Sequence, residues 1–155
     1  MHFYLLPKEY KECRLPDSFH IEVVKNPIHH LRALKWVFFS VFNLKEYRIL
    51  YKNQIVAVAR VVPKIWNFTF MPKNSYTIIA CSTQLQYRGR GLYASLLQYI
   101  VSENRNNNTP FYIFASSDNH ASIKGIEKAG GCLIGYGKRT RFGFYKITQQ
   151  IKNEL

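Results

Sequence analysis

The sequence predicts a single domain of the mixed α/β class, and three observations support that fold class. The chain has 155 residues, which is enough for one domain with a hydrophobic core and short for two. Hydrophobic residues make up 47% and charged residues 20% of the chain, a balance typical of folded globular proteins. From residue 76 to residue 115 the pattern changes from strand to helix to strand, which favours a parallel crossover in a mixed sheet.

The first element that the pattern predicts is an amphipathic helix over residues 27–42. Asn26 and Pro27 form a typical helix start. Apolar residues then recur at helical spacing, namely Leu31, Leu34, Phe38, Val41 and Phe42. The other face carries His29, His30, Arg32 and Lys35. We expect this helix to pack on the core with a solvated basic face, and a helix lying on a membrane surface is the alternative.

Three strands are predicted next. Residues 47–51 and 55–62 are rich in β-formers and flank a short turn in which Asn53 tolerates a left-handed conformation, so they predict a hairpin. A third strand, about residues 76–83, runs directly into a glycine-bearing segment at residues 88–91.

The second half alternates between helices and strands. A helical pattern passes through Leu92, Leu96, Leu97 and Ile100, and a buried-looking strand follows at residues 111–115. Another helix, about residues 121–129, is expected to end at the Gly130-Gly131 pair. Two final strands are predicted at about residues 132–136 and 142–147.

Charge and composition narrow the class of protein. The formal net charge is +13, which favours anionic partners such as nucleic acid, a membrane surface or a phosphorylated small molecule. No apolar run approaches the ~20 residues that span a bilayer, and no secretory leader is visible. Three distant cysteines, Cys13, Cys81 and Cys132, do not match any zinc spacing. We therefore expect a cytoplasmic protein without a metal.

The segment between the third strand and the following helix predicts a phosphate site. A helix N-terminus exposes backbone N–H groups and partial positive charge, and glycine lets a ligand approach the backbone closely. Arg88 and Arg90 add formal charge, so a pyrophosphate suits this loop. A glycine turn that merely opens an ordinary helix is the alternative. The segment lacks the lysine of a P-loop and the third glycine of a Gly-x-Gly-x-x-Gly motif.

Two motifs in this half resemble those of the GNAT superfamily of acyl-CoA-dependent N-acyltransferases. Gln86-Tyr87-Arg88-Gly89-Arg90-Gly91 resembles the phosphate loop of that family. Asn119 to Gly130, with Ser122 and Lys128 between them, resembles its second coenzyme-contacting helix. The resemblance covers roughly residues 76–136. It implies a central mixed sheet with two splayed parallel strands, flanked by helices, and acetyl-CoA as co-substrate.

The resemblance also implies roles for individual residues. Arg88 and the backbone amides around Gly89, Arg90, Gly91, Leu92 and Tyr93 would hold the coenzyme pyrophosphate. The strand edge at Cys81, Ser82 and Thr83 would pair with the pantetheine amides, and Asn119 and Ser122 would lie beside the pantetheine arm. Simpler alternatives exist for three residues: Asn119 as a helix cap, Ser122 as a solvent-facing residue and Lys128 as a last-turn lysine.

The catalytic groups are less clearly indicated. The family generally transfers the acyl group directly within a ternary complex, through a carboxylate or water-linked base and a tyrosine acid, but Ile126 stands where that tyrosine is expected. Tyr136 and Tyr93 are candidate acids, and Glu46 is the first candidate base. The reserve bases are His29, His30 and His120. Cys81 could carry an acyl group covalently, although a buried strand cysteine is the favoured interpretation.

The sequence therefore predicts an acetyl-CoA-dependent N-acetyltransferase that acts on a primary amine. Because a basic surface repels polycations, we expect the acceptor to carry phosphate or carboxylate, for example an amino sugar attached to a nucleotide. An acyl-CoA-binding module without catalysis is the alternative that Ile126 suggests. A nucleic-acid-binding protein is less favoured, because the basic residues are dispersed and no recognised motif is present. A homodimer is compatible with the sequence.

Overall fold

The computed structural model describes residues 1–7, 15–25, 44–65, 67–104 and 109–151. The helix predicted over residues 27–42 lies outside these ranges, as do Cys13, His29 and His30. The element bounds, in chain order, are β1 His2–Leu5, β2 Phe19–Lys25, β3 Lys45–Tyr51, β4 Gln54–Pro63, β5 Tyr76–Thr83, the 3₁₀ turn η3 Leu85–Tyr87, α1 Leu92–Glu103, β6 Phe111–Ala115, α2 His120–Lys128, β7 Cys132–Arg139 and β8 Tyr145–Gln150.

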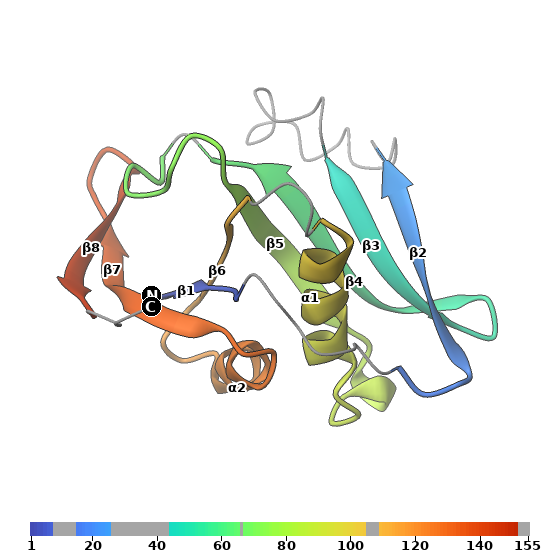
Figure 1. Cartoon of the computed structure of the whole chain (residues 1–155). Coiled ribbons are helices and arrows are strands. Elements are labelled where there is room, and N and C mark those ends of the chain that lie inside the picture. Colours follow the sequence, from blue (N-terminus) through green and yellow to red (C-terminus); the bar gives the residue numbers. More distant parts are fainter. Residues whose placement is uncertain (8–14, 26–43, 66, 105–108, 152–155) are drawn as a thin grey trace.

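The strands form one mixed sheet in the order β2-β3-β4-β5-β6-β1-β7-β8 (Figure 1). Strands β5 and β6 are parallel, and the other pairs of neighbours are antiparallel. Helix α1 connects β5 to β6, as a parallel pair requires. The predicted mixed sheet, its hairpin and its parallel crossover are therefore confirmed.

Two strands were not predicted, and the last strand begins later than predicted. β2 alternates apolar and polar residues from Phe19 to Val23, a signal that could have identified it. β1 has only four residues, HFYL, with no alternation to reveal it. The last strand begins at Tyr145 rather than at residue 142, because Thr140 and Phe144 close a turn through a 2.7 Å backbone hydrogen bond.

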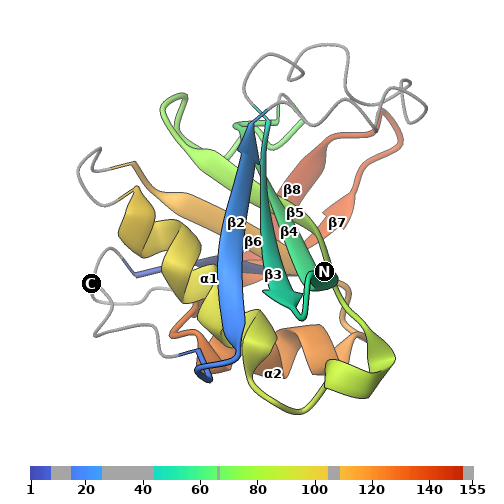
Figure 2. The same cartoon turned by 90° about the vertical axis from the view of Figure 1, so that its right-hand side faces the viewer.

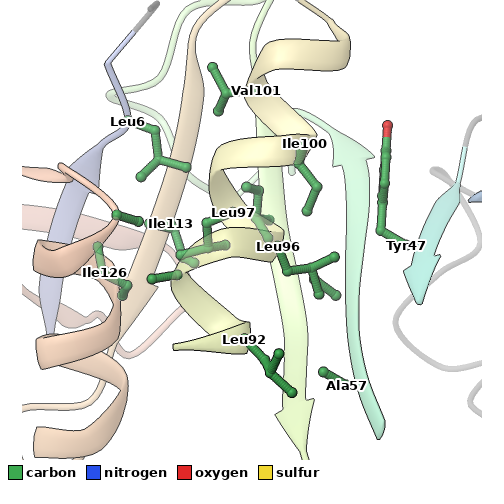
Figure 3. Packing of buried hydrophobic residues seen from close by; sticks show 14 of the residues in the cluster. Leu6, Tyr47, Ala57, Leu92, Leu96, Leu97, Ile100, Val101, Ile113 and Ile126 are labelled. Atoms are coloured by element: carbon green, nitrogen blue, oxygen red, sulfur yellow. The ribbon is translucent and has the colours of Figure 1, made fainter. Parts of the chain in front are cut away.

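Helices α1 and α2 pack against one face of the sheet (Figure 2). The apolar residues of α1 recur at positions 92, 96, 97 and 100, so they form one stripe that faces β3, β4 and β5. Figure 3 shows Leu96 and Leu97 of α1 with Ile113 of β6 and Ile126 of α2. Burial of each such side chain stabilises the fold by about 1.5–3 kcal/mol. This core fixes the position of the N-terminus of α1 relative to the end of β5.

A smaller aromatic cluster covers the opposite face of the C-terminal half. Phe3 belongs to it, whereas its neighbour Tyr4 belongs to the main core, as alternation along a strand requires. Phe68, from the β4–β5 connection, stacks on Tyr145 of β8 with ring centroids 4.7 Å apart. Both faces of this half of the sheet are thus packed.

Candidate functional site

The parallel strands β5 and β6 separate part of the way along their length. Their ladder contains three pairs, the last of them Ile78 with Ile113. β5 then continues to Thr83 and β6 to Ala115 without further pairing between them. The predicted splay is confirmed, and it opens the edge of β5 that contains Cys81, Ser82 and Thr83.

A bulge in β5 lies at this open edge. Val58 of β4 pairs with Ser82 and Arg60 pairs with Ile79, so Ala80 and Cys81 both face a single residue of β4. Ala80 has φ +49°, in the left-handed region that non-glycine residues rarely adopt. Such bulges bend a strand and redirect its polar groups. Here the bend falls where the two parallel strands part.

The glycine loop follows this edge and leads into α1. Gly89 and Gly91 have φ values of +77° and +79°, which glycine adopts without strain. Gly91 is the N-cap of α1, and glycine has no side chain that could cap the helix. The first-turn N–H groups of an α-helix have no intrahelical partner, so this N-terminus suits an anion.

Positive charge surrounds the loop. Arg88 donates through Nε to the Thr83 carbonyl at 3.1 Å, which ties the loop to the end of β5. The Arg90 guanidinium lies over the Tyr87 ring, 5.4 Å from its centroid. A Cβ on Gly91 would lie 3.4 Å from Lys128 Nζ, so the amine of the last α2 residue is close to the N-terminus of α1. From the sequence, Lys128 can be read simply as a last-turn lysine that suits the helix dipole. Its place beside α1 depends on how the two helices pack.

Helix α2 contributes Asn119 and Ser122 to the same region. Asn119 is the N-cap, and its side chain accepts a hydrogen bond from the Ser122 N–H at 3.1 Å. Ser122 Oγ lies 3.3 Å from the Tyr93 hydroxyl of α1. Asn119 is therefore a helix cap, and Ser122 faces α1 rather than solvent.

Tyr93 fills the space between the two helices. Its ring lies so close to Gly125 that a Cβ there would be 2.3 Å from Tyr93 Cδ1. Burial raises the pKa of the phenol, and the nearby Cys81 raises it further. Tyr93, a residue of α1, thus presents a neutral hydroxyl to Cys81 of β5 and Ser122 of α2.

Cys81 is a half-buried cysteine on β5. Burial raises the pKa of its thiol to about 12, although a hydrogen bond with Tyr93 opposes that shift. The thiol therefore stays protonated near neutral pH. Because the thiolate is the nucleophile, this geometry disfavours a covalent acyl carrier.

Glu46, the candidate base, is held by two arginines on the sheet. Its buried carboxylate accepts hydrogen bonds from Arg48 Nε and Arg60 Nε, both at 2.7 Å. Burial acts to raise the pKa of Glu46, but the arginines outweigh it and the pKa is lowered. A carboxylate with a lowered pKa binds protons weakly, which disfavours a role as general base.

Tyr136, the candidate acid, lies on a distant strand. It belongs to β7, which β6 and β1 separate from β5. Three strand spacings amount to about 14 Å across the sheet. The Tyr136 ring packs edge-on against His2, with centroids 4.8 Å apart. The structure thus brings Cys81, Ser82, Thr83, Arg88–Tyr93, Asn119 and Ser122 together, but not Tyr136.

Two other residues from the sequence analysis lie at α2. Ile126 is fully buried in the main core, and its aliphatic side chain has no hydroxyl that could act as an acid. His120 is exposed in the first turn of the helix.

In the parts of the chain that the structure describes, no helix is long and apolar enough to cross a membrane. Within those same parts, no group of three potential metal ligands comes together.

Comparisons with solved structures identify the fold. No family model and no curated protein matches the sequence. A GNAT-family acetyltransferase from Novosphingobium aromaticivorans superposes with a TM-score of 0.57 at 13% identity, over 85% of this chain and 58% of its own. A GCN5-related N-acetyltransferase-like protein from Streptococcus suis gives 0.55 at 19%, over 86% and 57%. The chain thus spans little more than half of these two proteins.

AAC(6')-Ib matches over most of its own length. Its complex with ribostamycin and coenzyme A superposes with a TM-score of 0.55 at 16% identity, covering 86% of this chain and 94% of that protein. Another AAC(6')-Ib structure contains acetyl-CoA and gives the same values. The chain has the GNAT acetyltransferase fold, and the resemblance in its two motifs is confirmed at the level of the fold.

Proposed function

We propose that the protein is an acetyl-CoA-dependent N-acetyltransferase. One observation carries the proposal: the open edge of β5 leads directly to a helix N-terminus whose N-cap is a glycine, without a capping side chain of its own. The open strand edge can pair with a ligand's amides, and the helix N-terminus can bind a diphosphate that follows them. Coenzyme A has both, and the GNAT fold supports the assignment.

The residues along the open β5 edge and at the N-terminus of α1 suit acetyl-CoA, which supplies an activated acyl thioester. Backbone N–H groups from Gly89 to Tyr93 would bind the pyrophosphate, with Arg88, Arg90 and Lys128 adding charge. The β5 edge at Cys81, Ser82 and Thr83 would pair with the pantetheine amides. We assign Asn119 and Ser122 to the flank of the pantetheine arm.

Catalysis would then proceed by direct attack of the acceptor amine on the thioester. The new C–N bond replaces the C–S bond, the amine loses a proton to solvent, and the thiolate gains one. Of the two candidate tyrosines, Tyr93 is beside the open edge, and its neutral hydroxyl can donate a hydrogen bond to the leaving sulfur. Tyr136 and Glu46 stay predictions that distance and the lowered pKa, respectively, disfavour.

The acceptor that we propose is a primary amine on an anionic molecule. AAC(6')-Ib is solved with the aminoglycoside ribostamycin, which is polycationic. This chain carries +13, so it repels polycations, whereas an amine that also carries phosphate or carboxylate is attracted. A nucleotide-linked amino sugar is one such acceptor.

Thermal denaturation with acetyl-CoA tests the coenzyme site. Ligand at one hundred times its dissociation constant should stabilise the protein by about 2.7 kcal/mol. Gly91→Val should abolish this ligand-induced shift. Gly143→Val is the matched control, because Gly143 also has positive φ, +83°, and a Cβ there meets a cationic side chain at 3.5 Å. An equal acetyl-CoA shift in both variants would refute the proposed loop.

A thiol-release assay with a panel of amines tests turnover. Acetyl-CoA-dependent release that requires an anionic amine supports the proposal. An acyl-CoA-binding module without catalysis is the second candidate, because the buried Ile126 removes the expected acid. A normal acetyl-CoA shift without thiol release from any amine would select that module.

A further inference from the structure

The β7–β8 hairpin contains a concentrated run of positive charge. Its residues 138–146 include Lys138, Arg139, Arg141 and Lys146, and no Asp or Glu occurs between residues 128 and 151. All four cationic residues are exposed. Such a run of cations attracts polyanions, and the segment itself contributes no carboxylate.

An aromatic side chain is exposed at the tip of this hairpin. Phe142 is 81% exposed, more than the other exposed large apolar residues of the described chain, Leu85 at 77% and Ile55 at 42%. Its ring therefore contributes almost nothing to the core. A single exposed apolar side chain is ordinary on a protein surface, but this ring follows Arg141 directly and belongs to the same cationic hairpin.

Hydrogen bonds within the turn and to Asn67 hold the tip that presents Phe142. The Phe144 N–H donates to Thr140 Oγ1 at 3.1 Å, and the Thr140 N–H donates to the Phe144 carbonyl. Buried Asn67 donates through Nδ2 to the Gly143 carbonyl at 3.2 Å. The backbone carbonyl of Asn67 accepts a hydrogen bond from the Tyr145 N–H at 2.9 Å. Little conformational entropy is lost when such a preorganised tip binds a partner.

We propose that this hairpin binds single-stranded nucleic acid. Arg141 and its neighbouring cations would contact phosphates, and the Phe142 ring would stack on a base. A stacking site needs only one aromatic face, because every base offers a π-surface. One Phe, by contrast, gives little apolar area for insertion into a membrane. The hairpin lies at the opposite end of the sheet from β2, and two strands separate it from β5 (Figure 1).

The test measures fluorescence anisotropy of labelled 20-nucleotide RNA and DNA strands of low secondary structure, at several salt concentrations. Phe142→Ala should weaken binding about 5- to 150-fold, the equivalent of one lost stacking contact. Arg141→Gln should weaken binding and reduce the salt slope by about 0.7. Leu85→Ala removes another exposed apolar side chain and Lys52→Gln another exposed charge, and both should bind as the wild type does.

Several results would overturn the proposal. These are no binding at low salt, equal weakening by Phe142→Ala and Leu85→Ala, or equal weakening by Arg141→Gln and Lys52→Gln. Binding to phosphatidylserine vesicles is measured in parallel. If Phe142→Ala weakens vesicle binding but not RNA binding, the tip contacts a membrane instead. Acetyl-CoA should still stabilise the Phe142→Ala variant, so this test is independent of the proposed acetyltransferase activity.

Discussion

Replacing Gly125 by alanine should destabilise the protein when Tyr93 is present and stabilise it when Tyr93 is absent. Gly125 lies inside α2, and glycine in a helix interior is about 1 kcal/mol less favourable than alanine. A Cβ at this position would be 2.3 Å from Cδ1 and 2.7 Å from Cε1 of Tyr93. The ring therefore has to move.

The magnitude follows from these opposing effects. Overpacking of a tight site typically costs 1–3 kcal/mol of stability. Because these contacts are very short, we take the upper end of that range, about 3 kcal/mol. Offset by the helix propensity of alanine, Gly125→Ala should lower the free energy of unfolding by about 2 kcal/mol, which is about 4–8 °C in Tm. In the Tyr93→Ala protein the same change should raise it by about 1 kcal/mol.

Urea denaturation of the wild type, both single variants and the double variant measures this coupling as a double-mutant cycle. Lys124→Ala is the control, because Lys124 is exposed on the same helix and its effect should be small with or without Tyr93. Additive effects of Gly125→Ala and Tyr93→Ala, within about 0.5 kcal/mol, would refute the contact between the two helices.

Substitutions at three other positions test local features. Glu46→Gln should destabilise the protein by about 2–4 kcal/mol at pH 7, because the neutral amide no longer balances the charges of Arg48 and Arg60. Since the folded pKa of Glu46 is lowered from about 4.5, this difference should persist above pH 4.5 and shrink as the pH falls through the folded pKa, as measured by urea denaturation at each pH. Ala80→Gly should stabilise by up to about 1 kcal/mol and Ala80→Val should destabilise, and equal Tm values would contradict the positive φ. Asn119→Ala should cost about 1 kcal/mol, and Asn119→Ser should recover most of it if the capping bond is the cause.

Features that depend on local chemistry could be predicted from the sequence. The glycine loop, the start of α1 and the parallel crossover all follow from residues close together in the chain. The cap at Asn119 was foreseen as one of two alternatives for the same reason. Spacing, propensity and glycine conformation determine these features.

Features that depend on pairing between distant segments could not be predicted. Glu46 and Arg48 share a strand face because they are two residues apart, but the Arg60 contact depends on the β3–β4 register, which a bulge shifts. The contact between Tyr93 and Gly125 depends on the packing of α1 on α2. For Tyr136, the insertion of β1 between β6 and β7 sets the distance from β5.

The position of β1 bears on the order in which the chain folds. Its partners on both sides are synthesised late, and the Met1 amino group donates to the carbonyl of Gly137, which is 136 positions away. Closing so long a loop is entropically unfavourable and slow. On the ribosome, the segment His2–Leu5 must therefore stay without its sheet partners until β6 and β7, which lie more than 100 residues further along the chain, have emerged.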